Sequence, residues 1–158
     1  MAAKRKKEAG KAKKIGAVLV VGGGIGGVQA SLDLANAGFK VYLVESSPAI
    51  GGRMAQLDKT FPTNDCSMCI LSPKLVECGR HPDIELLTYS ELLELDGAPG
   101  HFRARVLKHP RYINEELCTG CGTCQEKCPS KTQSEFDEGL GVRTVSYTHL
   151  TLPTKRIV

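Results

Sequence analysis

Residues 15–45 read IGAVLVVGGGIGGVQASLDLANAGFKVYLVE, and this stretch decides the fold. It opens with an apolar run rich in branched side chains, which is typical of a strand buried in a parallel sheet. Residues 28–37 then place apolar side chains at helical spacing, and Gly38 follows where a helix C-cap is expected. Residues 40–45 form a second strand. The order strand, glycine-rich turn, helix, strand predicts a βαβ unit and an α/β fold.

A G-x-G-x-x-G motif joins the first strand to the helix. We expect Gly22 to make the tight turn, Gly24 to admit a pyrophosphate and Gly27 to let helix and strand pack closely. The anion would lie at the helix N-terminus, where free N–H groups and the helix dipole favour negative charge. Glu45 follows about 20 residues on, where a carboxylate can accept both hydroxyl hydrogens of a ribose. A glycine loop alone is a weak signal, but all five features in register predict a dinucleotide site.

The residues after the second strand bear on which dinucleotide is bound. Glu45 does not discriminate, because FAD and NAD both present a ribose diol. Residues 46–53, SSPAIGGR, resemble the second half of the FAD site in flavoproteins that have two dinucleotide domains. Gly52 would lie in the turn there, and Arg53 could pair with a phosphate. We therefore interpret the site as one for FAD rather than NAD.

Residues 118–129 read CTGCGTCQEKCP, which is the pattern C-x2-C-x2-C-x3-C-P. Bacterial-type ferredoxins hold [4Fe–4S] clusters with this spacing. Cys118, Cys121 and Cys124 are the expected ligands of one cubane, and Cys128 is expected to bind a second. The alternative is a disulfide framework or chance clustering, but all the spacings and the proline match the cluster pattern. The run therefore indicates electron-transfer chemistry.

Residues 51–80 connect these two patterns and carry a family resemblance. They read GGRMAQLDKTFPTNDCSMCILSPKLVECGR and resemble the iron–sulfur flavoprotein of heterodisulfide reductase, its A-subunit. The resemblance extends from about residue 15 to about residue 143, with the dinucleotide unit, the middle cysteines and the ferredoxin run in the same order. It implies an incomplete Rossmann-like FAD domain of the thioredoxin-reductase type with an inserted α+β ferredoxin-like [4Fe–4S] module.

The same resemblance implies an oxidoreductase subunit that moves electrons between FAD and iron–sulfur clusters, with other subunits of a redox complex as partners. Some such proteins take part in flavin-based electron bifurcation. They are several times longer than this chain, so we interpret the sequence as an N-terminal fragment that is inactive alone. The alternative is a non-catalytic electron relay or scaffold subunit of a sulfur-metabolism redox complex. The sequence assigns no catalytic residue, substrate or electron donor.

Cys66, Cys69 and Cys78 lie in a segment rich in turn-forming residues, which predicts a loop. Three interpretations stay open. The three thiols could join a ligand from elsewhere to hold a further cluster. Cys66 and Cys69 could act as a dithiol near the flavin, as C-x-x-C pairs do. All three could instead be small buried hydrophobic side chains.

The pattern downstream predicts further elements and the domain boundaries. Residues 83–88 are expected to form a third parallel strand, and residues 91–95 a short helix capped by Ser90. Alternation over residues 102–106 predicts a hairpin strand. We divide the chain into a basic leader at 1–14, a partial FAD domain at 15–108, a partial ferredoxin-type module at 109–140 and a non-native tail at 145–158 that resembles a translated sequencing adapter.

Charge and composition exclude several other classes. The 158-residue chain has a net charge of +4, but residues 1–14 hold seven Lys or Arg against one acid. This leader has no aromatic residue to stack on bases, so we expect no nucleic-acid partner. No apolar stretch is long enough for a transmembrane helix, and the leader lacks an apolar signal core. Cysteines at cluster spacing indicate a reducing, cytoplasmic location.

Overall fold

The structure is a computed structural model, and it describes residues 16–111, 117–134, 136–144 and 156–157. The leader expected at residues 1–14 and most of the tail expected at residues 145–158 lie outside the described residues. Among the residues that are described, no helix is long and apolar enough to cross a membrane.

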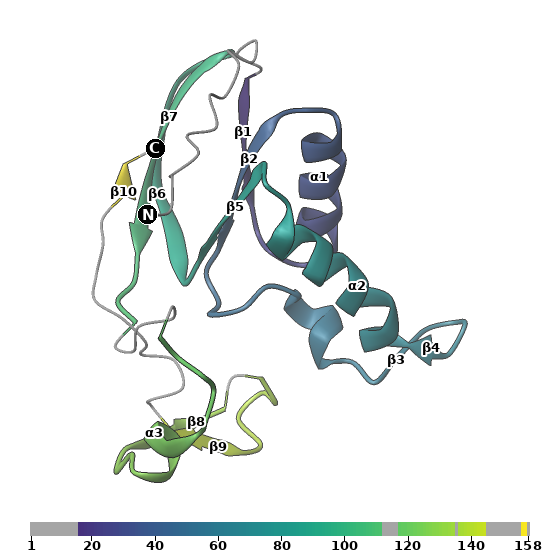
Figure 1. The fold of residues 1–158 in the computed structure, drawn as a ribbon, viewed down its shortest axis with the longest axis vertical. Coiled ribbons are helices and arrows are strands. Elements are labelled where there is room, and N and C mark those ends of the chain that lie inside the picture. Colours follow the sequence, from purple (N-terminus) through teal and green to yellow (C-terminus); the bar gives the residue numbers. More distant parts are fainter. Residues whose placement is uncertain (1–15, 112–116, 135, 145–155, 158) are drawn as a thin grey trace, which may run out of the picture.

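A three-stranded parallel sheet with the order β1-β2-β5 forms the first unit (Figure 1). Its strands are β1 (Ala17–Val21), β2 (Lys40–Glu45) and β5 (Ile84–Thr88), and α1 (Ile25–Asn36) connects the first two. Leu43 of the central strand pairs with Val20 on one side and Leu86 on the other. The predicted βαβ unit and the predicted third parallel strand are both confirmed.

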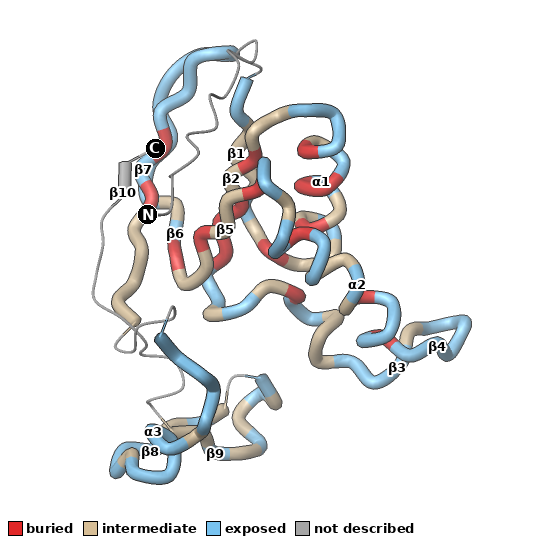
Figure 2. The backbone as a smooth tube through the Cα atoms, in the orientation of Figure 1, coloured by how far each residue is buried: buried red, intermediate tan, exposed pale blue. Residues whose placement is uncertain are grey.

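The core of this unit lies between α1 and the sheet. Val28 and Leu32 of α1 and Val41 and Leu43 of β2 are each at most 3% exposed. Figure 2 shows these buried stretches in red where α1 faces the strands. Each buried aliphatic side chain contributes roughly 1.5–3 kcal/mol to the stability of the fold, so burial of these side chains keeps α1 packed on the sheet. It also places the N-terminus of α1 at the carboxyl ends of the strands, where nucleotides bind in such sheets.

Helix α2 (Ser67–Arg80) occupies the segment that the sequence predicts to be a loop. It follows η1 (Gly52–Gln56), β3 (Lys59–Thr60) and β4 (Asp65–Cys66). Leu71, Leu75 and Cys78 are spaced four and three residues apart, so they share the helix face that packs on α1 and η1. Burial of this face outweighs the helix-breaking tendency of Pro73 and Gly79, and the loop prediction is wrong for that reason.

The predicted helix at residues 91–95 is also wrong. These residues belong to β6 (Ser90–Ala98), which pairs antiparallel with β7 (His101–Lys108). Glu and Leu favour helices locally, but pairing with β7 decides the conformation. The predicted hairpin strand is confirmed in β7, where Ala104 and Val106 are buried. The chain turns at residues 99–100, and β10 (Arg156–Ile157) pairs with the other edge of β7.

The cysteine run lies in a small segment that Figure 1 draws apart from the parallel sheet. It contains the one-turn helix α3 (Thr123–Glu126) and the antiparallel pair β8 (Lys131–Gln133) and β9 (Val142–Thr144). The described residues thus show an α/β dinucleotide unit followed by an α+β segment. This confirms the predicted fold class.

Candidate functional site

The glycine loop between β1 and α1 has the geometry of a phosphate site. Gly22 has a φ of 103°, and its N–H donates to Val44 O at 2.7 Å. A Cβ at Gly27 would lie 1.8 Å from Gly22 O, so only glycine fits there. A Cβ at Gly24 would meet nothing within 4 Å, so open space lies beside this N-cap residue. The N-terminus of α1 has no side-chain cap and no acid in its first turn, which suits an anion.

Glu45, the last residue of β2, is held by several hydrogen bonds beside this loop. Its Oε1 accepts from the backbone N–H and the hydroxyl of Ser47, both at 2.8 Å, and from the Ser46 hydroxyl at 3.3 Å. Its Oε2 accepts from the N–H of Gly23. Burial raises the pKa of the Glu45 carboxyl, but the bonds from Ser47, Gly23 and Ser46 outweigh burial and lower it. An ionised carboxylate here fits a ribose diol, whose hydroxyls would replace those of the two serines.

The turn at Gly51 and Gly52 packs directly on the glycine loop. The N–H of Gly51 donates to Gly23 O at 2.7 Å, and Gly51 forms an isolated bridge with Gly24. Gly52 has a φ of 55°, and a Cβ there would lie 3.0 Å from Gly24 Cα. The two glycine-rich segments, 28 residues apart at Gly23 and Gly51, therefore form one cradle in which backbone packs on backbone.

Arg53 extends from this turn into solvent. Its side chain is 77% exposed, forms an ion pair with Glu138 and donates to Gln56 Oε1 at 3.2 Å. The guanidinium beside the cradle is thus paired with a carboxylate from the cysteine-bearing half of the chain. A phosphate would have to compete with Glu138 for it.

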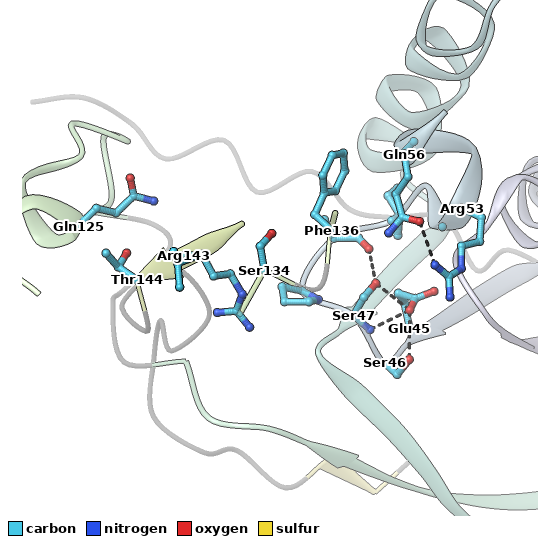
Figure 3. Close-up of a pocket in the computed structure, with 16 residues that line it drawn as sticks. Glu45, Ser46, Ser47, Arg53, Gln56, Gln125, Ser134, Phe136, Arg143 and Thr144 are labelled. Atoms are coloured by element: carbon cyan, nitrogen blue, oxygen red, sulfur yellow. Dashed lines mark hydrogen bonds between the residues drawn. The ribbon is translucent and has the colours of Figure 1, made fainter. Parts of the chain in front are cut away.

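A cavity of about 870 Å³ lies between the cradle and the segment that follows the cysteine run. Figure 3 shows Glu45, Ser47 and Arg53 on one side of it, and Phe136 and Arg143 among the residues from the other segment. Sequence reasoning missed the serines, although an acid followed by two hydroxyl residues at a strand end could have indicated them. It also missed Phe136 and Arg143, for which no local pattern exists.

The four cysteines of the ferredoxin run form no disulfide in the part of the chain that the structure describes. Cys118, Cys121 and Cys124 are exposed, and Cys128 is half-buried with its thiol donating to Ser130 O at 3.3 Å. Hydrogen bonds, chiefly from the side chain and then the backbone of Thr123, lower the pKa of Cys121. Within the described residues, no three His, Cys, Asp or Glu side chains converge as a metal site. The donor set fits iron, since thiolates are the cluster ligands, but the structure does not gather these thiols around one point.

The middle cysteines separate into two environments. Cys66 and Cys69 are exposed at the start of α2, whereas Cys78 is fully buried in the core near its end. Desolvation by burial raises the pKa of Cys78, followed by the nearby charge of Glu77. Cys78 is therefore a small core side chain. Among the three interpretations, a site that uses all three thiols does not fit this arrangement.

Two families match separate parts of the chain. The FAD dependent oxidoreductase family matches residues 17–66, which contain the glycine loop, Glu45 and the Gly51–Gly52 turn. The 4Fe-4S binding domain family matches residues 111–132, which contain the cysteine run. The chain accordingly carries an FAD-binding unit and a 4Fe-4S binding segment, as predicted.

Curated relatives match over most of this chain. An iron-sulfur A-subunit of CoB–CoM heterodisulfide reductase from Methanopyrus kandleri is 60% identical over 129 residues, which are 82% of this chain and 20% of that protein. The A-subunit of the H(2):CoB-CoM heterodisulfide,ferredoxin reductase from Methanothermobacter marburgensis is 57% identical over 89% of this chain and 21% of its own length. The chain thus spans about a fifth of these relatives.

Solved structures also align with part of this chain. L-proline dehydrogenase from P. horikoshii is 22% identical and aligns over 63% of this chain and 21% of its own, with a TM-score of 0.49. A putative thioredoxin reductase TrxB from Bacillus anthracis is 20% identical and aligns over 59% of this chain and 31% of its own, with a TM-score of 0.43.

Proposed function

We propose that this chain moves electrons between FAD and iron–sulfur clusters within a longer protein. More than four-fifths of the chain matches the A-subunit of heterodisulfide reductase. The observation that carries the proposal is the cradle of Gly23, Gly24, Gly51 and Gly52 beside Glu45, in one chain with a ferredoxin cysteine run. Its partners are the other subunits of a redox complex, which fits relatives whose names describe them as subunits.

The residues of the cradle have distinct tasks in this proposal. The open side of Gly24 and the uncapped start of α1 take the pyrophosphate, and Glu45 takes the ribose of the adenosine. Arg53 pairs with a phosphate once it leaves Glu138. The flavin supplies the coupling of two-electron chemistry to one-electron carriers when it is bound.

The cysteine run receives the electrons. Cys118, Cys121 and Cys124 bind one cubane, and Cys128 binds a second that takes its other ligands from outside this run. We place the protein in a reducing cytoplasm, because its cysteines stand at cluster spacing. The run follows the dinucleotide unit in sequence. Residues within 45–56 of the dinucleotide unit and within 125–144 line one cavity together.

Cofactor analysis of the anaerobically purified protein tests this proposal. Heat denaturation should release a yellow chromophore that elutes as FAD in chromatography, and acid treatment should release iron and sulfide. Released NAD, or protein without any flavin, would contradict the assignment of the dinucleotide site. Flavin without iron or sulfide would contradict the electron-transfer role.

A further inference from the structure

The start of α2 presents two thiols that the proposed electron-transfer function does not use. Cys66 is the N-cap residue of this 14-residue helix, with φ −62° and ψ 114°, and Cys69 lies in its first turn. The backbone N–H of Cys69 donates to Cys66 Sγ at 3.3 Å. This bond folds the Cys66 side chain back over Cys69, so that the two cysteine side chains interact.

The pKa values of the two thiols shift in opposite directions. Hydrogen bonds from the side chain and then the backbone of Cys69 lower the pKa of Cys66, although the charge of Asp58 opposes this. The same side-chain bond raises the pKa of Cys69, which remains the protonated donor. The pair therefore places a more acidic thiol beside a less acidic one, the arrangement of a redox-active C-x-x-C at a helix N-terminus.

The surroundings of the pair favour disulfide chemistry over metal binding. Cys78, the remaining cysteine of α2, is fully buried among core residues and cannot reach the pair without unfolding the helix. No third His, Cys, Asp or Glu among the described residues completes a metal site there. Both thiols are exposed, so a disulfide in solution can approach them.

The pair is also fixed relative to the dinucleotide cradle. Ser67, the residue between Cys66 and Met68, donates its hydroxyl to Met54 O of η1 at 2.6 Å. Leu71 packs near Gly51, where an added Cβ would lie 3.5 Å from its side chain. Since Gly51 bonds to Gly23 of the glycine loop, the first two turns of α2 are held beside the cradle through η1 and Gly51.

We propose that Cys66 and Cys69 form a dithiol–disulfide pair that exchanges with small-molecule disulfides. The Cys66 thiolate attacks one sulfur of a disulfide RS–SR and displaces one RS⁻, which leaves Cys66 joined to SR. The Cys69 sulfur then loses its proton and attacks Cys66 Sγ, which displaces the second RS⁻ and forms the Cys66–Cys69 disulfide. Two electrons and two protons pass to the disulfide, which becomes two RSH, and excess thiol reverses the exchange.

Thiol trapping in redox buffers tests the proposal. The purified protein is equilibrated anaerobically with mixtures of reduced and oxidised glutathione, alkylated, digested and analysed by mass spectrometry. We expect the peptide with Cys66 and Cys69 to lose both alkylation sites together as the disulfide. In Cys69→Ser, Cys66 should stop at the mixed disulfide with glutathione, and in Cys66→Ser, Cys69 should react at least about tenfold more slowly than Cys66 does in Cys69→Ser.

Two further measurements make the outcome decisive. Cys78→Ala removes the buried thiol of the same helix and should leave formation of the Cys66–Cys69 disulfide unchanged. Iron and sulfide content in a Cys66→Ser, Cys69→Ser double variant should match the unaltered protein. A fall in iron and sulfide would overturn the proposal and indicate that the two thiols are cluster ligands. Independent alkylation of both thiols at every buffer ratio would also overturn it, because no disulfide would then have formed. Flavin content of the same samples reports separately on the dinucleotide site.

Discussion

At the scale of single residues, Gly24 and Gly27 belong to one loop but differ in the space beside their α-carbons. A methyl group at Gly24 meets no protein atom within 4 Å and suits the φ of −72°, so Gly24→Ala should keep the melting temperature. The methyl group would occupy the approach of the pyrophosphate, so FAD affinity should fall at least about tenfold, which corresponds to roughly 1.4 kcal/mol. Gly27→Ala should lower the melting temperature, because its Cβ would lie 1.8 Å from Gly22 O.

Circular dichroism melting and bound flavin per protein separate these two variants. Gly79→Ala is the matched control, since a Cβ there also meets nothing within 4 Å and the residue lies in α2. It should raise stability by up to about 1 kcal/mol, as alanine is the better helix former, and leave flavin unchanged. Normal flavin retention in Gly24→Ala would argue against close approach of a pyrophosphate to this residue.

The Glu45 carboxyl should link stability to pH. Its folded pKa lies below the ordinary 4.5, because the hydrogen bonds from Ser47 and Gly23 outweigh burial. A lowered folded pKa means that the ionised group stabilises the fold fully above its unfolded pKa. That stabilisation is lost as the pH falls below about 4.5 through the folded pKa.

Urea unfolding of the unaltered protein and of Glu45→Gln at several pH values measures this link. The unaltered protein should be more stable at pH 7, and the difference should shrink steadily as the pH falls into the acid range. Glu77→Gln, which removes an exposed carboxylate of α2, is the charge control. A pH-independent difference would mean that the charge of Glu45 contributes nothing.

At the scale of secondary-structure elements, one residue of α2, Pro73, lowers the stability of the helix. Pro73 lies in the interior of the helix and is exposed, so it removes a backbone hydrogen bond without burying its ring. Pro73→Ala should therefore raise the free energy of unfolding by about 1–3 kcal/mol. Urea titration measures the change, with Glu77→Ala on the same helix as a control expected to stay within about 0.5 kcal/mol. A loss of stability in Pro73→Ala would show that its ring makes a contact that alanine cannot replace.

The elements also show what local sequence can and cannot predict. β1 and β2 follow from continuous apolar runs, because a buried parallel strand needs apolar side chains on both faces. β6 and α2 could not be predicted in this way, because contacts with residues distant in the sequence decide their conformation. Leu92 lies in a helix-favouring run but pairs with Val106 in β7, and Cys78 lies among turn formers but is buried in one core cluster with residues of α1 and the parallel sheet.

At the scale of the whole molecule, the candidate site combines residues that the sequence predicts with residues that it does not predict. Gly24 and Glu45 are predictable because the motif fixes their register along one βαβ unit, and Gly52 follows from the resemblance of residues 46–53 to FAD sites. Phe136 and Arg143 reach the same cavity from beyond the cysteine run. No local pattern predicts this, because their position depends on how the two halves of the chain fold against each other.

The number of thiolates in the chain limits which clusters it can hold. A [4Fe–4S] cubane needs four, and in two-cluster ferredoxins each run supplies three to one cluster and its fourth cysteine to the other. This 158-residue chain has one such run, and its thiols at Cys118, Cys121 and Cys124 are exposed. The cubane on these three therefore lacks its usual fourth ligand. Cys128 belongs to a cluster whose other ligands this run does not contain.

Anaerobic reconstitution of this chain with iron and sulfide should consequently give at most one cluster at the run, about four iron atoms per chain, and that cluster should bleach quickly in air. Cys121→Ala should abolish it, since three thiolates become two. Cys128→Ala should leave it nearly unchanged and is the matched control for loss of one thiol. Iron and sulfide assays with absorbance near the visible charge-transfer band measure the result. Two stable clusters bound by residues 109–140 would show that the ligand count is wrong and that Cys128 closes a site within this chain.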